Sequence, residues 1–247
     1  MLLRLPTSVS EAQECLAAGA VPIGGATLVW ATWQRDGFPE LAVSLRELPP
    51  ANVIGREAVG AAVVLHRIDD RVPDVLRLAA ATVGTGAVRR TATVGGNLVG
   101  STLRCLLPAA LVLDARATVL DADGVHETDL AEVVAKRPAL LSLQWRAPIA
   151  SAYRKLPAEA GGAPPLVVAS ALHAGDGAGS RLLVAVRDGY DVVSGATTGD
   201  TGTEQALHAL RGTALGDLPD AAWEVVAPQV TGLLEGRGNQ DSPRLPG

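Results

Sequence analysis

Two glycine pairs, Gly24-Gly25 and Gly95-Gly96, constrain the fold of this chain more than any other sequence feature. The first pair lies between an apolar, strand-like segment (residues 21–23) and a helix-like segment (residues 26–34). Glycine allows positive φ and, without a Cβ, lets a ligand approach the backbone. The first N–H groups of a helix have no partner within it, and the helix dipole favours negative charge there. We therefore expect a turn that is either an ordinary connection or a phosphate-binding loop.

The second glycine pair lies in a polar loop. Thr93, Asn97 and Ser101 place short polar side chains near Gly95-Gly96, and exposed backbone donors with such neighbours can bind an anion without a lysine. The alternative is a hairpin with Asn97 in a left-handed turn. The phosphate interpretation requires residues 24–25 and 95–96 to face one another across a common site.

Composition narrows the classes of function. The 247 residues are 48% hydrophobic and 19% charged, which is typical of a folded, soluble protein. The apolar run at residues 106–113 is too short to cross a bilayer, and the first residues lack a signal peptide, so we expect a cytoplasmic protein without a membrane partner. A net charge of −5 and 3% aromatic residues argue against nucleic-acid binding.

Metal-binding and catalytic patterns are not evident in the sequence. The two cysteines, Cys15 and Cys105, cannot by themselves form a zinc or iron–sulfur site. The four histidines are scattered and are expected to be surface or packing residues. We therefore expect no metal site, and the catalytic residues stay unknown.

The pattern of strands and helices changes near residue 148. Before it, the chain begins as an alternating β/α unit, and after it three strands of an antiparallel sheet precede two helices. Strands are predicted at residues 2–5, 21–23, 41–45, 53–54, 58–62, 117–120, 140–146, 152–156, 165–174 and 181–187. Helices are predicted at residues 8–18, 26–34, 73–83, 106–113, 202–211 and 219–234, with residues 84–96 as a loop.

Taken together and in this order, several segments resemble the FAD domain of the medium subunits of xanthine dehydrogenase and carbon monoxide dehydrogenase. That family reads AGG-x-[SD]-L, then IGA, then R-x-x-[AG]-T-[IV]-GG-[NS]-[LI]. The matching segments here are Ile23-Gly24-Gly25-Ala26-Thr27-Leu28, Val59-Gly60-Ala61-Ala62-Val63 and Arg90-Thr91-Ala92-Thr93-Val94-Gly95-Gly96-Asn97-Leu98. Residues 106–115 are similar to the helix that follows, and Tyr153-Arg154-Lys155-Leu156 is similar to the start of the family's C-terminal domain.

This resemblance implies an α+β protein that binds FAD. Residues 1–148 would form a two-subdomain FAD-binding fold of the vanillyl-alcohol oxidase/PCMH type, and residues 149–247 a small antiparallel sheet with helices. The pyrophosphate would contact the backbone of Ile23, Gly24, Gly25, Ala26, Thr27 and Leu28. The second wall would be formed by Thr93, Gly95, Gly96 and Asn97. Ser101 would lie near the ribityl chain, Leu141 near the flavin ring or the adenine, and Lys155 close to the cofactor.

The resemblance also implies a function as the flavin subunit of a molybdenum hydroxylase. Electrons would reach FAD from separate molybdopterin and iron–sulfur subunits and pass to NAD⁺, oxygen or another acceptor. A second hypothesis is a stand-alone flavin oxidase or dehydrogenase that modifies a small molecule such as a natural product. A third is a binding or non-redox module that has lost FAD.

One departure from the family pattern favours the second and third hypotheses, and a pair of tryptophans favours the second. Where the family has Ser-Pro-x-x-Asp, this chain has Ser101-Thr102-Leu103-Arg104-Cys105, so the acid that would bind the ribityl hydroxyls is missing. Cys105 is expected to pack in the core, and Arg104 to face a phosphate or an acidic substrate. Trp30 and Trp33 share a face of a predicted helix and are expected either to pack in the core or to line a pocket above the flavin.

Overall fold

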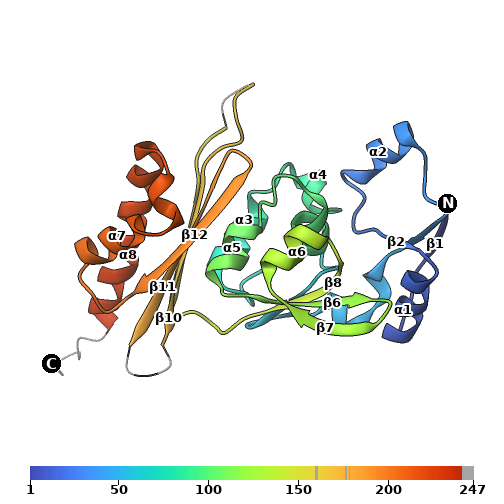
Figure 1. Cartoon of the computed structure of the whole chain (residues 1–247), viewed down its shortest axis with the longest axis horizontal. Helices are drawn as coiled ribbons and strands as arrows, with labels where there is room; N and C mark the ends of the chain where they lie inside the picture. The colour runs from blue at the N-terminus through green and yellow to red at the C-terminus, as the bar shows by residue number, and fades with distance from the viewer. Residues whose placement is uncertain (159–160, 176, 178, 241–247) are drawn as a thin grey trace.

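The computed structural model describes residues 1–240 except 159–160, 176 and 178. The described residues form three parts in a row, with the N-terminal part at one end and the last two helices at the other (Figure 1). Each part is built around its own sheet, and three clusters of buried apolar side chains form the core.

The first part is the predicted alternating β/α unit. Its strands pair in the order β1-β3-β2 and are all parallel. Its elements are β1 (Leu2–Arg4), α1 (Val9–Ala17), β2 (Val21–Pro22), α2 (Val29–Asp36) and β3 (Leu41–Val43). Ser8 caps α1 by accepting from the backbone N–H of Glu11 at 3.2 Å, and Gly19 ends it with a φ of 81°.

Helix α2 departs from the prediction in two ways. It begins at Val29 instead of residue 26, because Ala26 has a φ of 55° and is not helical. None of its side chains is buried, and Trp30 is 48% exposed. The expectation that Trp30 and Trp33 pack in the core is therefore wrong. Both rings instead contact Phe38 edge-on, and the Phe38 ring centroid lies 5.2 Å from that of Trp30 and 6.2 Å from that of Trp33.

The second part contains an antiparallel sheet of order β4-β5-β8-β6-β7. Its strands are β4 (Ile54–Gly55), β5 (Ala58–Gly60), β6 (Arg116–Asp121), β7 (Gly124–Thr128) and β8 (Ala139–Gln144). Its helices are α3 (Asp74–Ala81), α4 (Gly86–Arg89), α5 (Leu107–Val112) and α6 (Leu130–Lys136). The prediction missed β7, a largely exposed edge strand, and α4 and α6. The sequence signal for each helix is a single N-cap residue. Thr85 caps α4 by accepting from the backbone N–H of Val88, and Asp129 caps α6 by accepting from that of Glu132.

The third part is an antiparallel sheet of order β12-β11-β10-β9 followed by two helices. Its elements are β9 (Ala150–Lys155), β10 (Val167–Ala174), β11 (Ser180–Asp188), β12 (Asp191–Thr198), α7 (Thr203–Arg211) and α8 (Asp220–Gln240). Strand β12, which was not predicted, carries polar residues because it is an edge strand.

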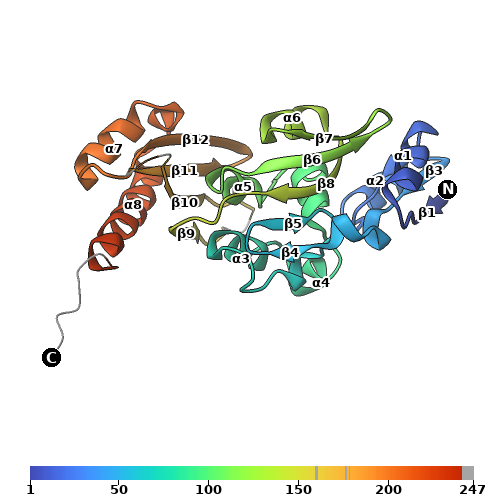
Figure 2. The same cartoon turned by 90° about the horizontal axis from the view of Figure 1, so that it is seen from below.

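Both faces of this third sheet are covered. Helices α3 and α5 lie over one face and α7 and α8 over the other (Figures 1 and 2). Side chains alternate accordingly: Ala169 and Ala185 join the core of the second part, whereas Val168 and Val184 pack with α8. The sheet therefore shares a core with the part that precedes it. No helix in the described part of the chain is both long and apolar enough to cross a membrane.

Candidate functional site

The two glycine pairs meet in space, as the phosphate interpretation requires. A Cβ added to Gly24 would overlap Thr93 Oγ1 and lie 3.5 Å from the Cα of Gly96. A Cβ added to Gly25 would overlap the carbonyl group of Thr91. Both positions therefore need glycine because the two backbones approach so closely.

The first loop exposes backbone donors at this meeting point. Ile23 N–H is used in the sheet, where it donates to the carbonyl oxygen of Val43 at 2.8 Å. Among the residues that the structure describes, none accepts a hydrogen bond from the backbone N–H groups of residues 24–27. Gly24 and Thr27 are exposed, and the positive φ of Ala26 turns the chain within this run. A run of unpaired N–H groups just before a helix fits the phosphates of a dinucleotide.

The second loop differs, because other groups of the protein already accept hydrogen bonds from its backbone N–H groups. Gly95 N–H donates to Ala61 O at 2.8 Å, Gly96 N–H to Thr93 Oγ1 at 3.1 Å, and Asn97 N–H to Thr93 O at 2.9 Å. The expectation that Gly95-Gly96 exposes free donors is therefore wrong. The loop lies against the first one, where Thr93 Oγ1 and the backbone of Gly96 face Gly24.

Asn97 and Ser101 hold the segment that follows the second loop. Asn97 Oδ1 accepts from the backbone N–H of Leu106 at 2.9 Å, and Ser101 Oγ accepts from that of Leu103 at 3.2 Å. Asn97 lies in a short π-helical turn, Gly96–Gly100, and has no positive φ, so the hairpin alternative is wrong. Both side chains are buried and fix the path of residues 101–105.

Residues 104 and 105 depart from the family pattern and lie at the end of this segment. Cys105 is buried in the main core cluster, as expected from its small apolar side chain. Arg104 has a φ of 38°, and its Nε is buried without a hydrogen-bond partner among the described residues.

Leu141 and Lys155 lie outside the glycine loops. The Leu141 side chain is 2% exposed in the core of the first part, and its carbonyl oxygen accepts from Ala61 N–H at 2.8 Å. Lys155 Nζ donates to Thr82 O at 2.8 Å. The Tyr153 hydroxyl lies 2.9 Å from Thr82 Oγ1, and burial raises the pKa of Tyr153 although this hydrogen bond opposes the shift. The predicted cofactor contacts of Leu141 and Lys155 stay predictions.

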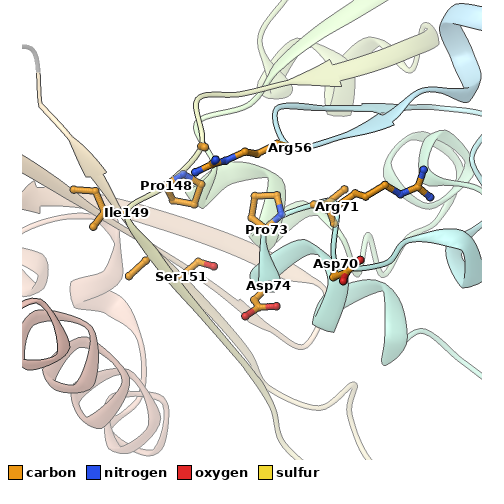
Figure 3. Close-up of a pocket in the computed structure, with 11 residues that line it drawn as sticks. Arg56, Asp70, Arg71, Pro73, Asp74, Pro148, Ile149 and Ser151 are labelled. Carbon is orange, nitrogen blue, oxygen red and sulfur yellow. The ribbon is translucent and has the colours of Figure 1, made fainter. Parts of the chain in front are cut away.

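A cavity of about 600 Å³ lies away from the glycine loops, between the start of α3 and the connection into β9 (Figure 3). Arg56, Arg71, Asp70 and Asp74 bring both signs of charge to its wall. Arg71 is paired with Asp69 at 2.8 Å. The cavity contains none of the predicted cofactor residues, and its balanced charge does not select an anion.

Other chemistry-bearing residues show structural roles. His173 is buried, and its Nε2 lies 2.7 Å from the carbonyl oxygen of Val112. In the part of the chain that the structure covers, His, Cys, Asp and Glu side chains form no group of three or more that could hold a metal ion.

Comparison with protein families identifies the part of the chain that carries the loops. A family model described as the FAD-binding domain in molybdopterin dehydrogenase matches residues 3–144. This range includes both glycine pairs. No curated protein sequence matches at a significant level.

Solved structures share the fold over almost the whole chain. A carbon monoxide dehydrogenase from Hydrogenophaga pseudoflava that lacks the molybdenum-pyranopterin moiety superposes with a TM-score of 0.69 at 16% identity, covering 93% of this chain and 94% of that one. Quinoline 2-oxidoreductase from Pseudomonas putida 86 gives 0.65 at 17% identity, covering 96% of both chains. Reconstituted CO dehydrogenase from Oligotropha carboxidovorans gives 0.65 at 21% identity, covering 95% and 86%.

Proposed function

Because this chain belongs to the family of FAD-binding domains of molybdopterin dehydrogenases, FAD is its cofactor, and we propose that it relays electrons as the flavin subunit of such an enzyme. Bound FAD supplies the redox chemistry, and the protein positions it and tunes its electronic properties.

The unpaired N–H groups of residues 24–27 carry the proposal. They lie where Gly24 meets Thr93 and Gly96, so one ligand can touch both loops. A diphosphate satisfies several such donors at once and matches the positive end of the helix dipole. In this role the first loop donates hydrogen bonds, and the second loop packs against the ligand.

The remaining predicted contacts are part of the same proposal. Thr93, Gly95, Gly96 and Asn97 form the second wall, and Ser101 lies near the ribityl chain. Leu141 near the flavin ring or the adenine, and Lys155 close to the cofactor, complete the site. The location of Ser101 directly after the π-helical turn of the second loop supports its role.

The partners follow from the role of electron relay. Two cysteines in the whole sequence cannot ligate an iron–sulfur cluster, so separate iron–sulfur and molybdopterin subunits would supply the electrons. A small-molecule acceptor would remove them. A cytoplasmic location without nucleic-acid or membrane partners stays a prediction.

The domain organisation is also proposed. The parallel unit and the five-stranded sheet would be the two subdomains of a PCMH-type FAD-binding domain, residues 1–148. Residues 149–247 would be the C-terminal α+β domain. The proposal is supported by β8 ending at Gln144 and β9 beginning at Ala150, so that the boundary falls between two separate sheets.

The visible absorption spectrum of the purified protein tests FAD binding. We expect a yellow protein whose released cofactor has the mass of FAD, or an apo-protein that takes up added FAD. Because the first loop is suited to a diphosphate, FAD should bind much more tightly than FMN, which has a single phosphate. A colourless protein that binds neither flavin would contradict the proposal and support the FAD-free module.

A stand-alone flavin oxidase or dehydrogenase is the second candidate, favoured by Arg104-Cys105 in place of the family's acidic residue. Affinity purification from the native host separates the two. Recovery of a large molybdopterin subunit supports electron relay. Its absence, together with anaerobic bleaching of the flavin by a small substrate, supports the stand-alone enzyme.

A further inference from the structure

Arg187 on β11 is a buried cation that has no acidic partner among the described residues. The residue is 1% exposed and has the largest side chain among those that are almost completely buried. Its Nη1 donates to Leu103 O at 3.1 Å and to Cys105 Sγ at 3.4 Å, and its Nη2 donates to Pro165 O at 2.8 Å. Its Nε has no partner among the described residues. The side chain therefore has neutral acceptors on two segments.

A guanidinium stays charged when it is buried, and burial without a counter-ion is costly. The three acceptors stabilise the donors but do not neutralise the charge. A second cation shares the same face of the sheet. Lys155 and Arg187 lie in one cross-strand row through Val167, and directly paired residues point to the same face. This face, toward α3 and α5, therefore carries positive charge.

This charge is connected to the glycine loops by a short series of contacts. Arg187 contacts Cys105, and the next residue, Leu106, donates its N–H to Asn97 at 2.9 Å. Asn97 directly follows Gly96. The guanidinium thus holds the far end of the segment that begins at Ser101, the residue proposed to lie near the ribityl chain.

We propose that the buried charge of Arg187 favours the reduced state of the bound flavin, and that the neutral Cys105 leaves this charge uncompensated. This inference rests on the proposed function, since it needs bound FAD. Reduction of FAD by two electrons with uptake of one proton gives a ring with one negative charge. A fixed positive charge of the protein stabilises that product more than the neutral, oxidised ring, by an energy that falls with distance.

The test compares the two redox states of FAD in the purified full-length chain. Dithionite supplies the electrons, and a reference dye reports the reduction potential. Cys105→Asp places a carboxylate beside Arg187. The protein should then bind reduced FAD about tenfold less tightly relative to oxidised FAD, which lowers the reduction potential of the bound flavin by about 30 mV for a two-electron couple. Cys105→Asn has the same shape without charge and should leave the ratio unchanged. A new hydrogen bond to the ribityl chain would affect both redox states and cancel in the ratio.

Variants of the arginine give an independent measurement. Arg187→Met should shift the ratio in the same direction as Cys105→Asp, whereas Arg187→Lys should retain most of the wild-type value because it keeps the charge. Arg181→Met is the matched control on the same strand, because Arg181 is half exposed and already paired with Asp114 at 2.9 Å. It should have no effect.

Equal potentials in the wild type and Cys105→Asp would overturn the inference and leave the proposed function intact. A shift in Cys105→Asn as large as that in Cys105→Asp would also overturn it, because shape and not charge would then be responsible. If the wild type binds no FAD, the proposed function fails and the inference fails with it.

Discussion

Replacing Gly25 with alanine tests whether the close approach of the two loops builds the cofactor site. The new Cβ would overlap the carbonyl group of Thr91 and lie 3.0 Å from Ala92 N. The two backbones would have to separate by on the order of 1 Å before the methyl group reached an ordinary contact distance. Such overpacking costs about 1–3 kcal/mol of stability. The substitution should therefore act on stability and on binding together.

The same separation should weaken FAD binding. If one N–H of residues 24–27 loses its charged acceptor, the loss is about 1.5–3 kcal/mol, or about 10- to 100-fold in Kd. The assay is a fluorescence titration of apo-protein with FAD, with a thermal melt of the same sample.

Gly100→Ala is the matched control, because a Cβ at Gly100 meets no atom within 4 Å and its φ is not in the left-handed region. We expect wild-type binding from this control. If Gly25→Ala binds FAD as tightly as Gly100→Ala, the two loops do not form a common site.

Three further substitutions test local features. Thr93→Val removes the acceptor of Gly96 N–H and should cost about 1–3 kcal/mol in urea unfolding, whereas Thr93→Ser should not; equal loss in both would refute this role. Ser8→Ala removes the N-cap of α1 and should cost about 1 kcal/mol, whereas the neighbouring Ser10→Ala should cost nothing. Burial raises the pKa of Tyr153 above 10, so this group stabilises the fold fully below pH 10, and that stability is lost as pH rises through the folded-state pKa. In Tyr190→Phe, where Tyr153 is the one remaining tyrosine, tyrosinate absorbance should develop above pH 10 in the folded protein and nearer pH 10 in urea; identical curves would contradict the burial effect.

The sequence by itself determined most of the helices and strands and the positions of the two glycine loops. The sequence offers Ser8 or Ser10 as the cap of α1 and Gly19 as its end, and the structure shows that Ser8 is the cap. Apolar periodicity found the strands that are buried on one or both faces. It missed β7 and β12, because edge strands expose polar residues and their pattern resembles a loop. The glycine motifs identified the family, and in the structure Gly24 and Gly25 are needed because the two loops approach so closely.

Only the tertiary structure decided how these segments combine. That Gly24 lies against Gly96, and that Thr93 uses up the donor of Gly96, depends on contacts between distant segments that no local pattern contains. The spacing of Trp30 and Trp33 likewise predicts that both lie on one face of a helix. It does not predict whether another part of the protein covers that face, and Trp30 is in fact exposed. The sequence pattern places Arg187 in a strand but does not indicate that its side chain is buried. Its burial against Cys105 arises because the sheet that carries it is covered on both faces, and packing across the whole molecule controls that environment.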